Sequence, residues 1–326
     1  MKKINLISVF FLITSIFSYS DSKELAFITN QESNKLDVID LTTKKKIDEI
    51  SLGKKPAGIY IDKESNKIYV SNPESNNVSV IDLMNNSNNF VNVGSSPLGI
   101  AVNSKDKNLF VSNWYDNIVS VVDLKTKKII KKISVGNSPA GIHFDSKINR
   151  LFVANRESNN ISVIDTNTLS ILKDVQVEKA PFGVYSEDYL SYIVVTNVQS
   201  NSISIIDKFT LERLHNIKVR KWPYSAIHNK KNNHLYITNQ RDDSISIIDM
   251  NQKKNVKTLS EICEYPEGID ISYIQNLIVV ACWFEDNIIL IDLNDFKILK
   301  RIQTSGGPRA FGKFILDDKN EWNRKK

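Results

Sequence analysis

Short runs of β-branched and aromatic residues, separated by polar turns, recur along the chain about every 42 residues. One unit contains four of them, at Gly99–Val102, Asn108–Val111, Ile118–Val122 and Ile129–Val135. Runs of this length and composition, bounded by Asn, Asp and Ser, are typical of β-strands. Four strands in every 40 to 50 residues or so indicate one blade of a β-propeller. A lone blade would expose both faces of its sheet, so several blades must stack around an axis.

Three marker positions define the repeat. A proline opens each expected inner strand: Pro56, Pro97, Pro139, Pro181, Pro223, Pro266 and Pro308. Sixteen residues after each of the first six stands an Asn or its replacement: Asn72, Asn113, Asn155, Asn197, Asn239 and Cys282. Ten residues further an Asp ends an apolar run: Asp82, Asp123, Asp165, Asp207, Asp249 and Asp292. We expect each Asn to bond backbone groups of the following turn, and each Asp to cap the turn after the third strand.

The two ends of the chain supply parts of one blade. Counting back sixteen residues from Asn30, the first marker Asn, leads to Thr14, so the first unit has no inner strand of its own. After Pro308 an inner strand is expected at Ala310–Leu316, with no outer strands behind it. We predict that this strand completes the blade begun by Leu25–Thr29, which hides sheet edges that would invite association. The expected fold is all-β: a seven-bladed β-propeller of four antiparallel strands per blade, one domain over residues 21–316, with a disordered tail at 317–326.

Several segments carry a recognisable repeat motif: Phe27-Ile28-Thr29-Asn30, Tyr69-Val70-Ser71-Asn72, Phe152-Val153-Ala154-Asn155 and Tyr236-Ile237-Thr238-Asn239. They resemble the Tyr-Val-Thr-Asn repeat (YVTN, YncE-like) family of seven-bladed β-propellers, and the resemblance covers essentially the whole chain after its first 20 residues. It implies the propeller fold. It does not decide the function, because the family contains surface-layer, periplasmic-binding and enzyme-associated members.

The first 20 residues differ from the rest. Lys2 and Lys3 precede a mostly apolar stretch from Ile4 to Phe17, and the small Ser18 and Ser20 follow. This pattern predicts a secretory signal peptide at 1–20, cleaved after Ser20, and a periplasmic or secreted protein. The apolar stretch is shorter than the roughly 20 residues of a membrane span, so no span is expected in the mature chain. The chain has 43 Lys+Arg against 37 Asp+Glu, and its lysines are scattered rather than gathered on one groove, which argues against nucleic-acid binding.

Candidate binding residues fall on one of the two rims of the expected ring. The turn rim, formed by the turns after the first and third strands, is polar and rich in Lys. The connection rim carries the blade-to-blade connections and the turns after the second strands, and it is rich in aromatic residues and Arg. The candidates there are Trp114, Arg156, Phe182, Trp222, Tyr224, Arg241, Trp283 and Arg309. Aromatic residues mixed with Arg on one face are typical of binding surfaces, for a small ligand or a protein partner. The alternative is that these rings pack over neighbouring blades as lids on the core.

The remaining candidate chemistry leaves alternatives open. Cys263 and Cys282 could form a disulfide in an oxidising compartment or remain packed thiols. His143, His228 and Glu267 are the acid–base candidates if the protein is a lactonase- or lyase-like enzyme at the channel mouth. No spacing typical of a metal site, haem attachment or phosphate-binding loop is present, so no cofactor is expected. A binding protein is the favoured hypothesis, with the enzyme and a structural surface-layer role as alternatives.

Overall fold

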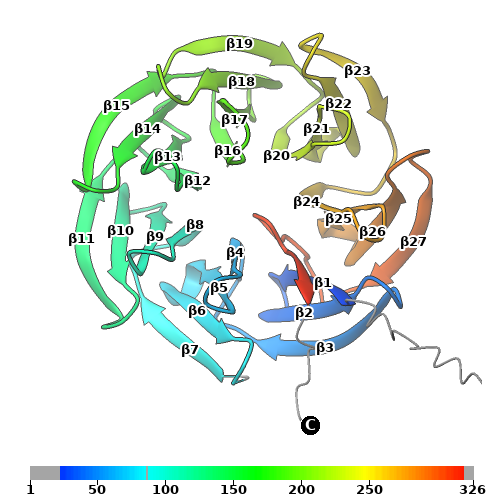
Figure 1. The fold of residues 1–326 in the computed structure, drawn as a ribbon. Coiled ribbons are helices and arrows are strands. Elements are labelled where there is room, and N and C mark those ends of the chain that lie inside the picture. Colours follow the sequence, from blue (N-terminus) through cyan, green and yellow to red (C-terminus); the bar gives the residue numbers. More distant parts are fainter. Residues whose placement is uncertain (1–22, 86, 319–326) are drawn as a thin grey trace, which may run out of the picture.

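The second and third strands of each blade are apolar on both faces, and both faces are buried between neighbouring sheets, whereas the fourth strands are largely exposed. This burial stacks seven four-stranded antiparallel sheets into a closed ring in the computed structural model (Figure 1). The structure describes residues 23–85 and 87–318. The predicted signal peptide at 1–20 and residues 319–326 of the predicted tail lie outside that range. No helix in the described part of the chain is long and apolar enough to span a membrane.

The predicted four strands per blade are confirmed. The innermost strands are β4 (Ile59–Asp62), β8 (Pro97–Asn103), β12 (Pro139–Asp145), β16 (Pro181–Tyr185), β20 (Pro223–Asn229), β24 (Pro266–Ser272) and β28 (Ile315–Asp318). The second strands are β1 (Lys23–Asn30), β5 (Lys67–Asn72), β9 (Asn108–Asn113), β13 (Arg150–Asn155), β17 (Tyr192–Asn197), β21 (His234–Asn239) and β25 (Leu277–Cys282). The third strands are β2 (Lys35–Asp40), β6 (Asn77–Asp82), β10 (Ile118–Asp123), β14 (Asn160–Asp165), β18 (Ser202–Asp207), β22 (Ser244–Asp249) and β26 (Asn287–Asp292).

The outer strands are β3 (Lys45–Ser51), β7 (Ser87–Asn92), β11 (Lys128–Ser134), β15 (Ser170–Gln176), β19 (Arg213–Lys218), β23 (Lys254–Leu259) and β27 (Ile298–Gln303). Blade 1 is the sheet β28-β1-β2-β3, and blades 2 to 7 follow in chain order from β4. Three short 3-10 turns follow second strands, at Pro73–Ser75, Gln240–Asp242 and Trp283–Glu285.

The marker residues hold each blade together and join it to the next. The Asp carboxylates accept backbone N–H bonds two and three residues on, as Asp123 does from Lys125 and Thr126, which confirms their predicted capping role. The predicted partner of the marker Asn, a backbone group of the following turn, was wrong. The Asn155 amide donates to the side chains of Asn160 and Ser162 on β14, at 2.8 and 2.9 Å, so it ties the second strand to the third.

The residue before the marker Asn links neighbouring blades. The Thr196 hydroxyl of blade 5 donates to the Tyr224 carbonyl of blade 6 at 3.0 Å, and it accepts the Gly183 N–H at 2.8 Å. Equivalent bonds run from Ser71 to Leu98 and from Thr238 to Glu267. These contacts give a physical role to both polar positions of the repeat motif.

Ring closure follows the prediction in topology but not in detail. β28 pairs with β1, as expected, and the predicted strand Ala310–Leu316 is wrong in its bounds. In blade 4, Asp145 stands six residues after Pro139 and pairs with the residue five before the marker Asn. In blade 1, Leu316 stands eight residues after Pro308 and pairs with the residue five before Asn30. The closing strand therefore contains two extra residues, which form a bulge between Pro308 and Ile315.

Candidate functional site

The centre of the ring contains a cavity of about 570 Å³. Its lining residues come from the inner strands and from the turns that follow them, so the cavity reaches the turn rim. Aliphatic residues such as Ile59, Ile142 and Val184 line it along the inner strands, and charged residues of the following turns, among them Asp62, Lys63, Glu64, Lys105 and Asp188, line it at the turn rim. This volume falls in the range of small-molecule sites.

A cluster of aromatic rings closes the cavity toward the connection rim. Phe182 and Tyr224 are 5 % and 3 % exposed, and their ring centroids lie 4.4 Å apart. Phe311, from the closing bulge, packs against both at 5.1 and 5.3 Å. The backbone of Phe311 also bonds blade 2, accepting from the Ile59 N–H and donating to the Ala57 carbonyl. The bulge thus crosses the channel and builds the floor of the cavity. We call the three rings of this floor, Phe182, Tyr224 and Phe311, the aromatic plug.

Four polar side chains approach one another in the cavity wall and floor. Lys313, from the closing bulge, forms an ion pair with Glu187, and Glu187 also accepts the Tyr185 hydroxyl at 2.8 Å. Burial alone would lower the pKa of Lys313, but the charges of Glu187 and Asp270 hold it above its usual value. Burial lowers the pKa of His143 to about 4, against the opposing charge of Glu187, so this imidazole is neutral at pH 7. Beside its aliphatic residues, the cavity therefore offers one ion pair and one neutral imidazole, with further charged side chains at the turn rim.

Asp270 fixes the bulge that carries Lys313. Its carboxylate accepts the backbone N–H groups of Phe314 and Ile315 at 2.9 and 3.0 Å, while burial raises its pKa. Sequence reasoning missed Lys313, Glu187 and Asp270. One signal was present: the fifth residue after each proline is apolar, Ser or His in the other six inner strands, and it is Lys in the last.

The predicted binding residues of the connection rim fall into three groups, of which the first two are in contact. Phe182 and Tyr224 belong to the plug. For these two residues the structure therefore shows the alternative, in which the rings pack as lids over the core. Trp114 packs on the same cluster, and Arg156 lies 5.9 Å from the Phe182 ring. Arg309 pairs with the buried Glu267 at 2.7 Å and bonds the Tyr224 hydroxyl.

The second group is Trp222 and Arg241 on blade 6. The guanidinium carbon of Arg241 lies 3.6 Å from the centroid of the Trp222 ring. The third is on blade 7, where Trp283 packs with Tyr265 and the 60 % exposed Phe284. Trp222 is half-buried and packs against the same aromatic cluster as Trp114, and the exposed Arg241 lies over it. The first two groups thus form one connected set of seven predicted residues, and Trp283 lies apart on blade 7.

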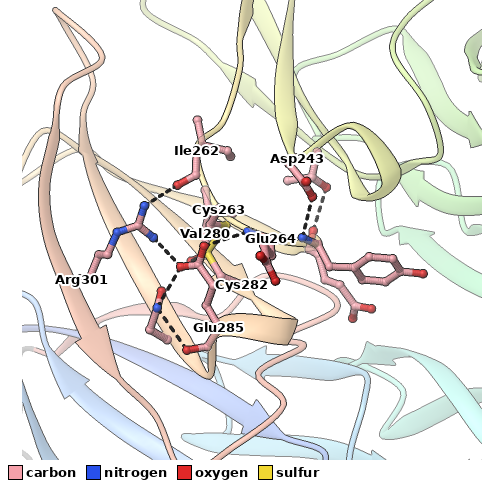
Figure 2. The surroundings of a disulfide bond; sticks show 12 residues. Asp243, Ile262, Cys263, Glu264, Val280, Cys282, Glu285 and Arg301 are labelled. Atoms are coloured by element: carbon pink, nitrogen blue, oxygen red, sulfur yellow. Dashed lines mark hydrogen bonds and ion pairs between the residues drawn. A yellow bond between two sulfur atoms is a disulfide. The ribbon is translucent and has the colours of Figure 1, made fainter.

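A disulfide between Cys263 and Cys282 supports the blade 7 group, with Cα atoms 5.9 Å apart (Figure 2). It joins the connection before β24 to the end of β25. Arg301 reinforces it, donating to the Ile262 carbonyl at 2.9 Å and to Glu285 at 2.6 Å. Cys282 stands where other blades have the marker Asn, and the Ser that would accept an Asn amide is Ile289 here.

The acid–base candidates lie apart from one another. Of the three, His143 lines the cavity, whereas His228 bonds Tyr189 and Asn233 at 3.1 and 2.8 Å. Glu267 lies beyond the plug, held by Arg309 and by the Gln240 amide. No hydrogen bond, ion pair or ring contact joins any two of these three in the described structure. Within the same residues, no group of three His, Cys, Asp or Glu side chains could hold a metal ion.

Comparisons with known proteins support the architecture. No protein-family model and no curated protein matches the sequence. A functionally unknown protein from Desulfotomaculum acetoxidans superimposes with a TM-score of 0.76 at 12% identity, over 87% of this chain and 98% of the other. Hydrazine synthase from Kuenenia stuttgartiensis gives 0.71 at 19%, over 78% and 88%. Apo AztD from Citrobacter koseri gives 0.64 at 13%, over 90% and 97%. At these identities the similarity establishes the propeller fold alone.

Proposed function

We propose that this protein is a secreted or periplasmic binding protein of the Tyr-Val-Thr-Asn repeat class, and that its ligand is a small molecule held in the central cavity. The observation that carries the proposal is the 570 Å³ cavity, which combines aliphatic inner-strand residues and Phe311 with the polar groups of Lys313, Glu187 and His143. Sites of this kind derive affinity from apolar burial and orientation from the polar groups. Secretion rests on the leader at 1–20, and N-terminal sequencing of the exported protein tests it.

The ligand's chemistry follows from the cavity wall. Aliphatic side chains favour a mostly apolar body, and Lys313 with Glu187 favours a polar end that both donates and accepts hydrogen bonds. The neutral His143 adds an uncharged polar contact. Our sequence-based expectation of a site on the connection rim is a separate hypothesis. The pairing of Arg241 with Trp222 supports that hypothesis, because it leaves an ordered cation at the surface.

A thermal-shift screen of residues 21–326 against amphipathic small molecules tests the cavity proposal, since a ligand that binds only the folded state raises the Tm. The decisive variant is Ala226→Phe, which fills the cavity from an inner strand. Ile171→Phe, on the exposed face of β15, is the matched control. We expect a ligand-induced Tm shift that Ala226→Phe abolishes and Ile171→Phe retains. A shift that both variants keep would place the ligand elsewhere and refute the proposal.

The enzyme hypothesis keeps one supporting observation, the neutral His143 near the Glu187–Lys313 pair in the cavity. A group with a strongly lowered pKa in a cavity is a candidate for acid–base chemistry. If a stabilising ligand is also converted to product, His143→Gln should abolish turnover while the Tm shift remains. Binding without turnover in the wild-type protein favours the binding proposal.

A further inference from the structure

A shallow groove of about 410 Å³ lies on the connection rim between blades 5 and 6. Gln199 and Asn201 line it from blade 5, and Lys221, Trp222 and Arg241 line it from blade 6. The groove shares no lining residue with the central cavity, and Trp222 packs against the aromatic cluster that contains the plug. The groove is therefore a second site, independent of the function proposed above.

Arg241 is held in place by its aromatic neighbour. Its guanidinium lies over the Trp222 ring at 3.6 Å, and this stacking uses none of its N–H donors. The Trp222 backbone is itself fixed, since its N–H donates to the Asn201 side chain at 3.1 Å and its carbonyl accepts from Gln240 at 2.9 Å. Trp222 has a φ of +57°, and the residue before the marker proline has a positive φ in every blade, so the repeat itself fixes the backbone here. A stacked guanidinium loses less conformational entropy when it binds an anion.

The positive charge is specific to this blade. The position of Arg241 is occupied by Glu32, Glu74 and Glu157 in blades 1, 2 and 4, so the charge is reversed here. Isolated surface lysines and arginines are ordinarily just solvated. In this groove, however, the nearby carboxylate Asp242 is already paired with Arg220 at 3.0 Å. Within the described residues, neither Lys221 nor Arg241 makes an ion pair.

We propose that the groove binds an oxyanion, a carboxylate or phosphate group carried by a small molecule or a polymer. The planar Arg241 guanidinium matches two oxygens of such a group in a bidentate contact, and Lys221 adds a second positive charge. Gln199 lines the same groove and supplies an uncharged amide that can bond hydroxyl groups next to the anion. Hydroxylated acids are the ligand class that these groups suit.

Trp222 provides a direct readout, because an anion that engages its stacked guanidinium changes the indole's surroundings. We would titrate the mature protein, followed by tryptophan fluorescence and calorimetry, with glucuronate and with glycerol phosphate. Glucose and glycerol are the matched neutral compounds. A carboxylate source is indicated if glucuronate binds more tightly, and a phosphate source if glycerol phosphate does.

The variants decide the assignment. We expect saturable binding of at least one anion, weakened at least tenfold by Arg241→Gln and by Lys221→Gln, and weakened by added salt. Lys179→Gln, at the position equivalent to Lys221 in blade 5, is the control and should bind as the wild type does. Circular dichroism and Tm confirm that each variant is folded. Equal affinity in Arg241→Gln, equal binding of the neutral compounds, or no saturation by either anion would overturn the proposal, whatever the result for the central cavity.

Discussion

Removal of the Cys263–Cys282 disulfide should lower the stability of the ring by an amount set by the loop that the bond closes. The two residues are 19 apart in sequence, and closing a loop of that length restricts the unfolded chain by about 3 kcal/mol. For a domain of this size the unfolding entropy is about 0.6 kcal/mol per kelvin, so the Tm should fall by about 5 °C. Both cysteines are buried, so Ala replacements also remove a small amount of packing.

The assay is guanidinium unfolding of the wild type and of Cys263→Ala/Cys282→Ala, each with and without reductant. The reduced wild type isolates the cross-link from the packing change, and the variant should not respond to reductant. Blade 7 carries the bond, so loss of protection against hydrogen exchange should be greatest in β24 and β25. A reductant effect below about 1 kcal/mol on the wild type would refute the reasoning, because the bond would then not be restricting the unfolded chain.

Two further predictions concern the blades and the cavity. Thr196→Val removes the hydrogen bonds to Gly183 and Tyr224 and leaves buried backbone groups unpaired. The free energy of unfolding, measured by urea titration, should therefore fall by about 2–3 kcal/mol. The control Thr168→Val, at an exposed position, should change it by less than about 0.5 kcal/mol. The pKa of His143 is about 4 in the folded protein and 6.5 in the unfolded chain, so between these pH values the unfolded chain binds more protons. The stabilisation that the neutral His143 contributes should therefore be fully present above pH 6.5. The free energy of unfolding should fall by at most about 3 kcal/mol as the pH drops to 4. In His143→Gln the same titration should be flatter, and an unchanged slope would contradict the assignment.

The sequence was sufficient to predict the ring because its marker residues make contacts within one blade or with the next. The spacing from Pro139 to Asn155 and on to Asp165 reflects local turns and strand pairing, so its repetition gave the blade count and the closure. Because successive strands of a blade run in opposite directions, each turn could also be assigned to one of the two rims, and this placed Trp222 and Arg241 on the same rim.

Depth along the channel could not be predicted in the same way. Phe182, on the inner strand β16, is buried against Phe311 of the closing bulge, whereas Trp222, in the connection before β20, is half-buried and also lines the surface groove. Lys313 and Glu187 come from blades 1 and 5, and no local pattern connects them. Their meeting depends on two extra residues in the last strand, whose path was not determined by periodicity.

The closing bulge also determines when the cavity can exist during biosynthesis. The cavity floor and Lys313 are contributed by the segment just before β28, which is the last strand of the described chain to leave the ribosome and which must pair with β1, among the first. Blades 2 to 7 can each form from contiguous sequence, whereas blade 1 and the cavity await the final contacts, those of longest sequence separation. Most of the wall comes from blades 2 to 7, but Phe311 and Lys313 arrive only with the closing bulge, so competence to bind in the cavity is acquired in one late step.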